Sequence, residues 1–194
     1  MEKRRTSLKC WQISLNLLLS QAERSFGRRP RIVIMGIGNE LRADDAAGVL
    51  VARRLLACEC VTEKEDRIRV VQAEHAPENA TWELRGFAPH LILLVDAAEM
   101  GEAPGTIRWI EMENIEGMSA STHSLPLSML SRYLVLEFNC PVALLGIQPA
   151  SNDLGEPVGA EVLHAVDEIV DGILDGICKT EFSPNQVEKH FLKA

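Results

Sequence analysis

The chain has 194 residues, of which 46% are hydrophobic and 25% charged, with a formal net charge of −8. This length suits one domain with a sizeable core, and the acidic balance argues against a nucleic-acid-binding protein, whose surface is usually basic. No apolar run approaches the roughly 20 residues of a membrane-spanning helix, so we expect no membrane insertion.

The five cysteines are odd in number, and none belongs to a C-x-x-C pair. Cys58 and Cys60 lie two residues apart, which is not the usual spacing of a zinc or redox site. We therefore expect reduced thiols and a cytoplasmic location.

We expect residues 1–30 to be an N-terminal extension that forms an amphipathic helix, docked on the domain or on a partner. The apolar residues Trp11, Leu15, Leu18, Ala22 and Phe26 follow a helical stripe. Basic residues before the stretch 10–19 superficially resemble a signal peptide, but polar residues interrupt that stretch. A misassigned start codon is a third interpretation.

Strands and helices alternate through the next part of the chain. In order, we expect a strand at 31–36, a helix at 45–57, a strand at 67–73, a short helix at 78–87 and a strand at 90–96. We then expect a strand at 106–111, a helix at 124–135, a strand at 141–147 and a helix at 159–178.

This alternation predicts an α/β fold with a twisted, mostly parallel sheet of about five strands and helices on both faces. The short link from Asp96 to Thr106 permits one antiparallel strand. Residues 31–180 are expected to form one domain, followed by a polar tail at 181–194.

The turn after the first strand is the most informative stretch. Gly36 and Gly38 follow an apolar run and allow a sharp turn and a close approach to the backbone. In an open α/β sheet, ligands bind at the carboxyl ends of the strands. Leu41 stands where a dinucleotide fingerprint needs its third glycine, so a nucleotide site is disfavoured.

Two adjacent acids, Asp44 and Asp45, follow this turn. Aspartate is a preferred helix N-cap and suits the positive end of the helix dipole. Two acids exceed what capping needs, and neighbouring side chains point in different directions. We therefore assign Asp44 to the turn and Asp45 to a functional pocket.

Asp96 and His123 complete a candidate set with Asp45. Asp96 closes the apolar strand L-I-L-L-V-D, at the edge where the glycine turn lies. Two carboxylates and an imidazole can bind a divalent first-row metal and leave coordination positions open. His75 competes with His123, because it also follows a strand end. The remaining histidines are expected to be surface residues without function: His90, His164 and His190.

Five sequence blocks carry a resemblance to a known family. They are G-I-G-N-E-L-R-A-D-D-A-A-G at 36–48, A-P-E-N at 76–79, L-L-V-D-A-A-E-M-G-E-A-P-G at 93–105, T-H-S-L-P-L at 122–127 and L-L-G-I-Q-P at 144–149. In this order they resemble the nickel-iron hydrogenase maturation endopeptidases, and in particular the type that processes the large subunit of hydrogenase 3, or formate hydrogenlyase.

The resemblance implies an aspartic-type endopeptidase that trims a C-terminal extension from the large-subunit precursor after nickel insertion. It places metal contacts on Asp45, Asp96 and His123, with Asp45 and Asp96 also catalytic. The nickel would be carried by the precursor rather than bound permanently by this chain. The family also implies a monomer.

The chain departs from the family where members carry a glycine pair after the second strand. Here residues 71–75 read V-Q-A-E-H. Substrate recognition is assigned to this segment and to the glycine turn, that is to Gly36, Gly38, Asn39, Glu74 and His75. Because of the departure, a nickel-sensing chaperone that binds the same precursor without cutting remains an alternative, and a nucleotide-binding regulatory module is a second one.

Overall fold

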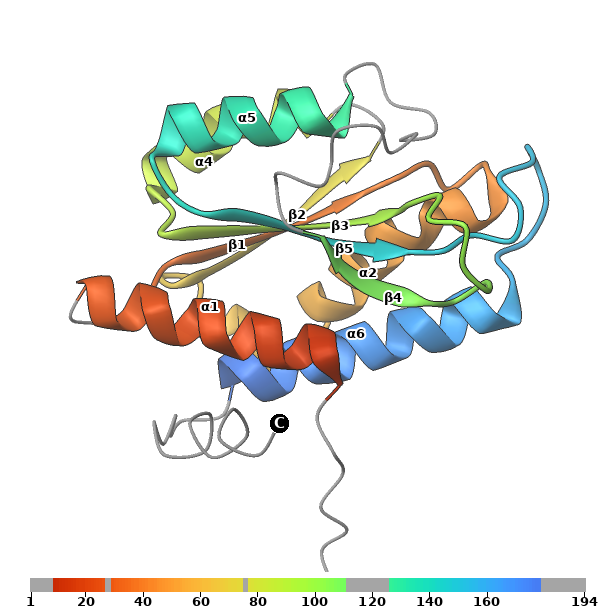
Figure 1. The fold of residues 1–194 in the computed structure, drawn as a ribbon. Helices are drawn as coiled ribbons and strands as arrows, with labels where there is room; N and C mark the ends of the chain where they lie inside the picture. Colours follow the sequence, from red (N-terminus) through yellow and green to blue (C-terminus); the bar gives the residue numbers. More distant parts are fainter. Residues whose placement is uncertain (1–8, 27–28, 75–76, 111–125, 179–194) are drawn as a thin grey trace, which may run out of the picture.

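A computed structural model shows a five-stranded sheet with helices on both faces (Figure 1). It describes residues 9–26, 29–74, 77–110 and 126–178. The strands are β1 (Ile32–Ile37), β2 (Ile68–Glu74), β3 (Leu91–Ala97), β4 (Ile107–Ile110) and β5 (Val142–Ile147).

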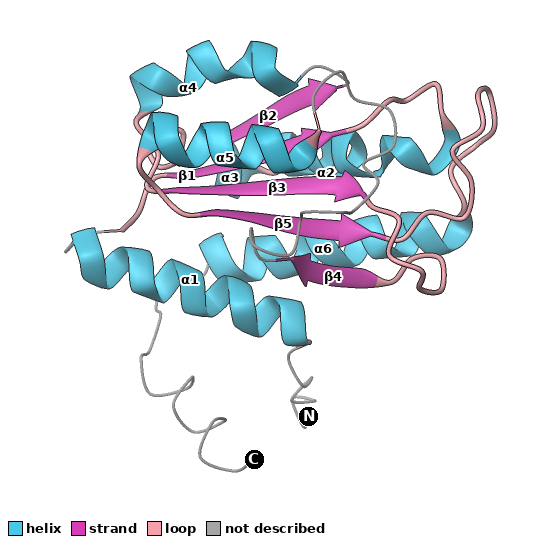
Figure 2. Ribbon diagram, turned by 45° about the horizontal axis from the view of Figure 1, so that its top comes forward, coloured by secondary structure: helices cyan, strands magenta, loops and turns pink. Residues whose placement is uncertain are grey.

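The strand order is β2-β1-β3-β5-β4, and β4 alone runs antiparallel to its neighbour (Figure 2). The predicted fold class is therefore confirmed. Every residue of β1, β3 and β5 is buried, which explains why these strands read as continuous apolar runs instead of alternating ones.

The helices form two layers, one on each face of the sheet (Figure 1). One layer consists of α1 (Cys10–Phe26), α2 (Ala47–Leu56), α3 (Glu59–Thr62) and α6 (Ala160–Cys178). The other consists of α4 (Thr81–Phe87) and α5 (Leu127–Phe138). Short 3-10 helices, η1 (Ala43–Ala46) and η2 (Pro77–Ala80), precede α2 and α4. The short α3 was not predicted. Within the described ranges, each helix is too short or too polar to cross a lipid bilayer.

The predicted N-terminal helix exists and packs on the domain. Its apolar stripe buries Trp11 and Leu15 against α6. A Cβ on Gly172 would lie 2.3 Å from the Trp11 ring, so the glycine provides the space that the indole fills. The indole Nε1 also donates a hydrogen bond to Glu168 Oε1 at 3.2 Å. Helix α1 is thus part of the core.

Two expectations from the sequence are wrong. Cys60 and Cys178 form a disulfide that joins the end of α6 to α3, so the thiols are not all reduced. The two cysteines are 118 residues apart, and local spacing gave no sign of the pairing. His90 is buried, not on the surface: its ring stacks on Phe26 at 3.8 Å, and its Nδ1 accepts a hydrogen bond from the Arg31 N–H. The C-terminal part of α1 covers it, which a local pattern cannot reveal.

We predict that Trp11→Ala lowers the free energy of unfolding by about 3–5 kcal/mol, because it leaves a cavity against α6. Urea unfolding followed by circular dichroism measures this. Trp82→Ala is the matched control, since Trp82 is 74% exposed whereas Trp11 is 3% exposed. Equal effects of the two substitutions would contradict a core role for α1.

Candidate active site

The structure places Asp45 and Asp96 at the carboxyl edge of the sheet. Asp96 lies near the end of β3, one residue beyond the Gly36–Val95 pair that joins β3 to β1. Asp45 lies in η1, directly after β1, and η1 contacts β3. Both carboxylates are buried. The sequence prediction that these two acids share one edge is confirmed by this arrangement, and their roles remain predictions.

Close packing of glycines brings η1 and α2 onto the sheet. A Cβ on Gly48 would lie 2.1 Å from the Val95 carbonyl oxygen and 2.3 Å from that of Ile37. Gly38 has a φ of +144°, and a Cβ there would lie 1.8 Å from the Asp45 carbonyl oxygen. Side chains at these positions would push Asp45 away from β3. Gly36 and Gly38 are themselves buried, so packing accounts for both.

Asp44 lies in the turn, as assigned from the sequence, but the helix N-cap expected of one of the two acids is absent at η1 and α2. Instead, Asp44 Oδ2 accepts hydrogen bonds from the N–H groups of Ala150 (2.7 Å) and Ser151 (3.2 Å), and Oδ1 accepts one from Gly159 (2.6 Å). The buried carboxylate therefore fixes the segment between β5 and α6. The only sequence signal for this role was that two acids exceed what capping needs.

A second set of hydrogen bonds fixes the turn between β1 and η1. Asn39 Oδ1 accepts a hydrogen bond from the Leu41 N–H at 3.0 Å, and the Asn39 N–H donates to the Asp45 carbonyl at 3.1 Å. The Leu41 carbonyl accepts a hydrogen bond from the Gly155 N–H at 2.8 Å. This turn and the segment after β5 are therefore joined by backbone contacts as well as by Asp44.

Gln148, which the sequence analysis did not single out, organises the neighbouring connection from β3 to β4. Its Oε1 accepts hydrogen bonds from the N–H groups of Met100 (2.7 Å) and Glu102 (3.2 Å). Its Nε2 donates to Glu99 Oε1 at 2.9 Å. A polar residue directly after a buried strand was the signal that could have revealed it, as it revealed Asp96.

Glu74 ends β2 in a left-handed backbone conformation, with a φ of +47°. The register of β1 and β2 shifts there, because Gly36 pairs with Gln72 but Ile37 pairs with Glu74. The Glu74 carbonyl accepts a hydrogen bond from the Gly38 N–H at 3.0 Å. A glycine would adopt this conformation without strain. The side chain of Glu74 is exposed at the same edge as the buried acids.

The predicted metal set cannot be completed from the described residues. His75 and His123 lie outside them, so the histidine of the set stays a prediction. Among the described residues, no group of three or more His, Cys, Asp and Glu side chains is arranged to hold a metal ion. Burial raises the pKa of the Cys140 thiol to about 11, so this cysteine stays protonated and is a poor nucleophile.

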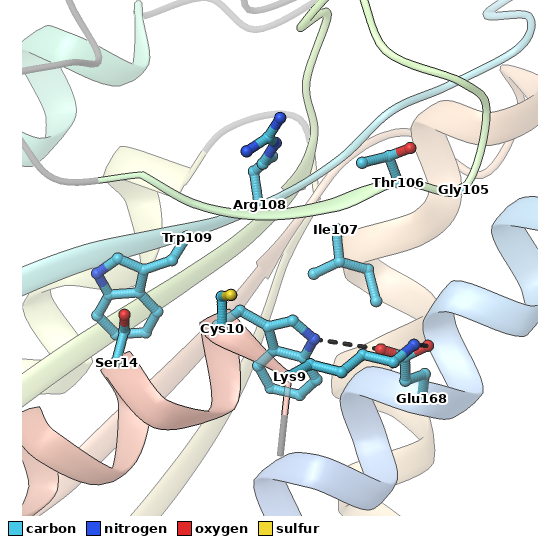
Figure 3. Close-up of a pocket in the computed structure, with 10 residues that line it drawn as sticks. Lys9, Cys10, Ser14, Gly105, Thr106, Ile107, Arg108, Trp109 and Glu168 are labelled. Atoms are coloured by element: carbon cyan, nitrogen blue, oxygen red, sulfur yellow. Dashed lines mark hydrogen bonds and ion pairs between the residues drawn. The ribbon is translucent and has the colours of Figure 1, made fainter. Parts of the chain in front are cut away.

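A separate pocket of about 680 Å³ lies beside edge strand β4 (Figure 3). It is formed by the start of α1, by β4 and by α6, and includes the Lys9–Glu168 ion pair. The indole of Trp109 and the side chain of Ile107 face α1 in this view. None of the acids at the carboxyl edge lines this pocket. It is therefore distinct from the candidate active site.

Comparisons with known proteins agree on one family. A profile described as "Hydrogenase maturation protease" (HycI) matches residues 53–179. The hydrogenase 3 maturation protease of Escherichia coli is 33% identical over 138 residues, which cover 71% of this chain and 85% of that protein. The crystal structure of a NiFe hydrogenase maturation protease, HycI, from Thermococcus kodakarensis matches with a TM-score of 0.67 and 30% identity, and covers 80% of this chain and 97% of that one. The solution structure of the endopeptidase HycI from Escherichia coli matches with a TM-score of 0.63 and 30% identity, over 77% and 94% of the two chains.

We predict that Asp44→Ala lowers the free energy of unfolding by about 3 kcal/mol or more, because three N–H groups lose a charged acceptor. Asp44→Asn should cost less, since one acceptor oxygen remains. Amide hydrogen exchange at Ala150 and Gly159 should accelerate in both variants. Asp153→Asn, at an exposed acid of the same segment, is the control and should leave exchange at these amides unchanged.

We also predict that Glu74→Gly raises the free energy of unfolding by about 1 kcal/mol. A non-glycine residue is strained in the left-handed conformation because of its Cβ, and glycine is not. The measurement is the midpoint of thermal unfolding. Glu65→Gly is the matched control, since Glu65 is an exposed turn residue that lacks a positive φ. That substitution should destabilise slightly. A loss of stability in Glu74→Gly would show that the side chain contributes more than the strain costs.

Proposed function

The chain belongs to the hydrogenase maturation protease family, and on this basis we propose that it removes a C-terminal extension from the large-subunit precursor of a nickel-iron hydrogenase. The hydrogenase 3 maturation protease among its relatives suggests a precursor of that class. Membership of the family also sets aside the nucleotide-binding interpretation.

The observation that carries this proposal is the position of Asp45 and Asp96. Both are buried on adjacent elements at the edge of the sheet where ligands of open α/β folds bind. Carboxylate oxygens are ligands that a divalent first-row metal accepts. Carboxylates at this place therefore suit a substrate that brings its own positive charge.

The precursor supplies that charge as the nickel ion it carries. Asp45, Asp96 and His123 contact this nickel in the proposed complex, and the chain needs no metal of its own. Carboxylate oxygen and imidazole nitrogen suit a divalent first-row metal. A precursor without nickel would lack these contacts, so cleavage would follow metal insertion and not precede it.

Docking through nickel would fix the scissile bond beside the carboxylates. Asp45 or Asp96 then accepts a proton from the water that attacks the peptide carbonyl, which makes the chemistry aspartic in type. Holding water, carboxylate and peptide bond in one geometry lowers the barrier by itself. Asn39 and Glu74 border the same edge and are proposed to contact the precursor.

The alternative is a chaperone that binds the precursor without cutting it, suggested by the loss of the family's glycine pair. Glu74 nevertheless holds the left-handed conformation that a glycine would adopt. The backbone of this edge is thus compatible with the peptidase, and we favour cleavage.

We further propose that the protein acts in the cytoplasm as a monomer. The Cys60–Cys178 disulfide is unusual for a reducing compartment. Thiol titration of protein taken directly from cells tests this location: free thiols at Cys60 and Cys178 would support it, and an intact disulfide would count against it.

We predict that the purified protein shortens the C-terminus of the nickel-loaded precursor from the same genome, as read by intact mass spectrometry. Asp45→Asn and Asp96→Asn should each lower kcat by about a hundredfold or more, the usual effect of losing a general base. His123→Ala should weaken cleavage by loss of a nickel contact. Omission of nickel from the precursor should abolish cleavage.

Asp171→Asn, at an exposed acid on α6, is the control and should cleave like the wild type. Binding of the precursor without a change in its mass would support the chaperone. Full activity of Asp45→Asn would show that the carboxyl edge is not the catalytic site.

A further inference from the structure

Two exposed leucines lie on neighbouring segments beside the candidate active site. Leu41 is 69% exposed and Leu154 is 72% exposed. The hydrogen bond between the Leu41 carbonyl and the Gly155 N–H joins the two segments, which are far apart in the sequence. Leu41 lies three residues before Asp44, and both segments are held by the Asp44 carboxylate.

The same two segments carry polar groups whose hydrogen-bonding capacity is unused. Arg42 Nε and Asn152 Oδ1 are buried and have no hydrogen-bond partner among the described residues. The Arg42 guanidinium takes part in none of the ion pairs found in the described part of the chain. A buried donor or acceptor without a partner is destabilising. Rotation of these half-buried side chains toward a ligand would therefore break no hydrogen bond among the described residues.

We propose that Leu41, Arg42, Asn152 and Leu154 form a rim that docks an extended segment of the precursor next to the scissile bond. The Arg42 guanidinium donates to a backbone carbonyl of that segment, and the Asn152 amide pairs with a backbone N–H. Leu41 and Leu154 contact apolar side chains of the same segment. This inference rests on the proposed function and identifies how the precursor is held.

The pattern of groups fits a polypeptide. Each residue of an extended chain presents one carbonyl acceptor and one N–H donor, which match one donor and one acceptor on the rim. The two exposed leucines supply the apolar contact that a charged ligand alone would not use. A nickel ion needs oxygen or nitrogen ligands, and these lie deeper, at Asp45 and Asp96.

The rim is formed before the precursor arrives. Asn39 fixes the Leu41 N–H, Gly155 fixes the Leu41 carbonyl, and Asp44 fixes Ser151 beside Asn152. The backbone under all four rim residues is thereby restrained while their side chains remain able to turn. Such preorganisation reduces the entropy lost on binding.

The test compares steady-state cleavage of the nickel-loaded precursor by the full-length wild type and by rim variants. Arg42→Met, Asn152→Ala and the double variant Leu41→Ser/Leu154→Ser should each raise KM by about tenfold, the effect of losing one hydrogen bond or two apolar contacts. Their kcat should stay within about twofold, because the rim does not touch the reacting atoms.

Controls come from matched residues elsewhere in the fold. Arg67→Met removes another half-buried arginine whose side chain has no hydrogen bond or ion pair within the described residues, at the opposite edge of the sheet. Leu136→Ser removes a leucine that is 83% exposed on α5. Both should leave KM and kcat unchanged. Circular dichroism checks that every variant is folded.

The outcomes separate the two proposals. If the wild type cleaves and the folded rim variants keep its KM, the rim proposal is wrong and the peptidase stands. A loss of kcat at unchanged KM would also overturn docking by the rim. If the wild type neither cleaves nor binds the precursor, the proposed function fails and the rim proposal fails with it.

Discussion

The carboxylate of Asp44 joins two segments that are remote in the sequence, the turn after β1 and the connection between β5 and α6. Asp44 lies in the turn after β1, and its carboxylate accepts hydrogen bonds from N–H groups that lie after β5 and before α6. A charged acceptor binds such donors more strongly than a neutral one. Asp45 is the neighbour of Asp44 in η1, and the proposed rim residues lie on the two segments that Asp44 joins. The positions of Asp45 and of the rim therefore depend on the hydrogen bonds of Asp44.

The two adjacent acids differ in what they do at the edge: Asp44 has a structural role, and Asp45 has the proposed catalytic one. Asp44 turns toward the backbone of the segment after β5, whereas Asp45 lies in η1, which contacts β3, the strand that carries Asp96. Glycines at positions 38 and 48 make this arrangement possible, since a Cβ at either would collide with backbone oxygens. Chemistry at the edge is thus supported by close packing one layer below.

The sequence predicts those features that repeat locally, and misses those made by distant contacts. Buried strands and amphipathic helices reveal themselves by periodicity, so the order of elements, the antiparallel β4 and the edge shared by Asp45 and Asp96 could all be predicted. The partners of Asp44 could not be predicted because they lie more than a hundred residues away. The same reason applies to the Cys60–Cys178 disulfide and to the burial of His90 under Phe26.

Glu74 has a consequence for how such an edge can change during evolution. One base change in a glutamate codon yields glycine, which adopts a positive φ without strain. The left-handed turn nevertheless forms with a glutamate in place, and its carbonyl still receives the Gly38 N–H. The hydrogen bond that fixes the backbone here uses the Glu74 carbonyl and not its side chain. A substitution at this position can therefore change the exposed side chain at the edge while the backbone contact remains.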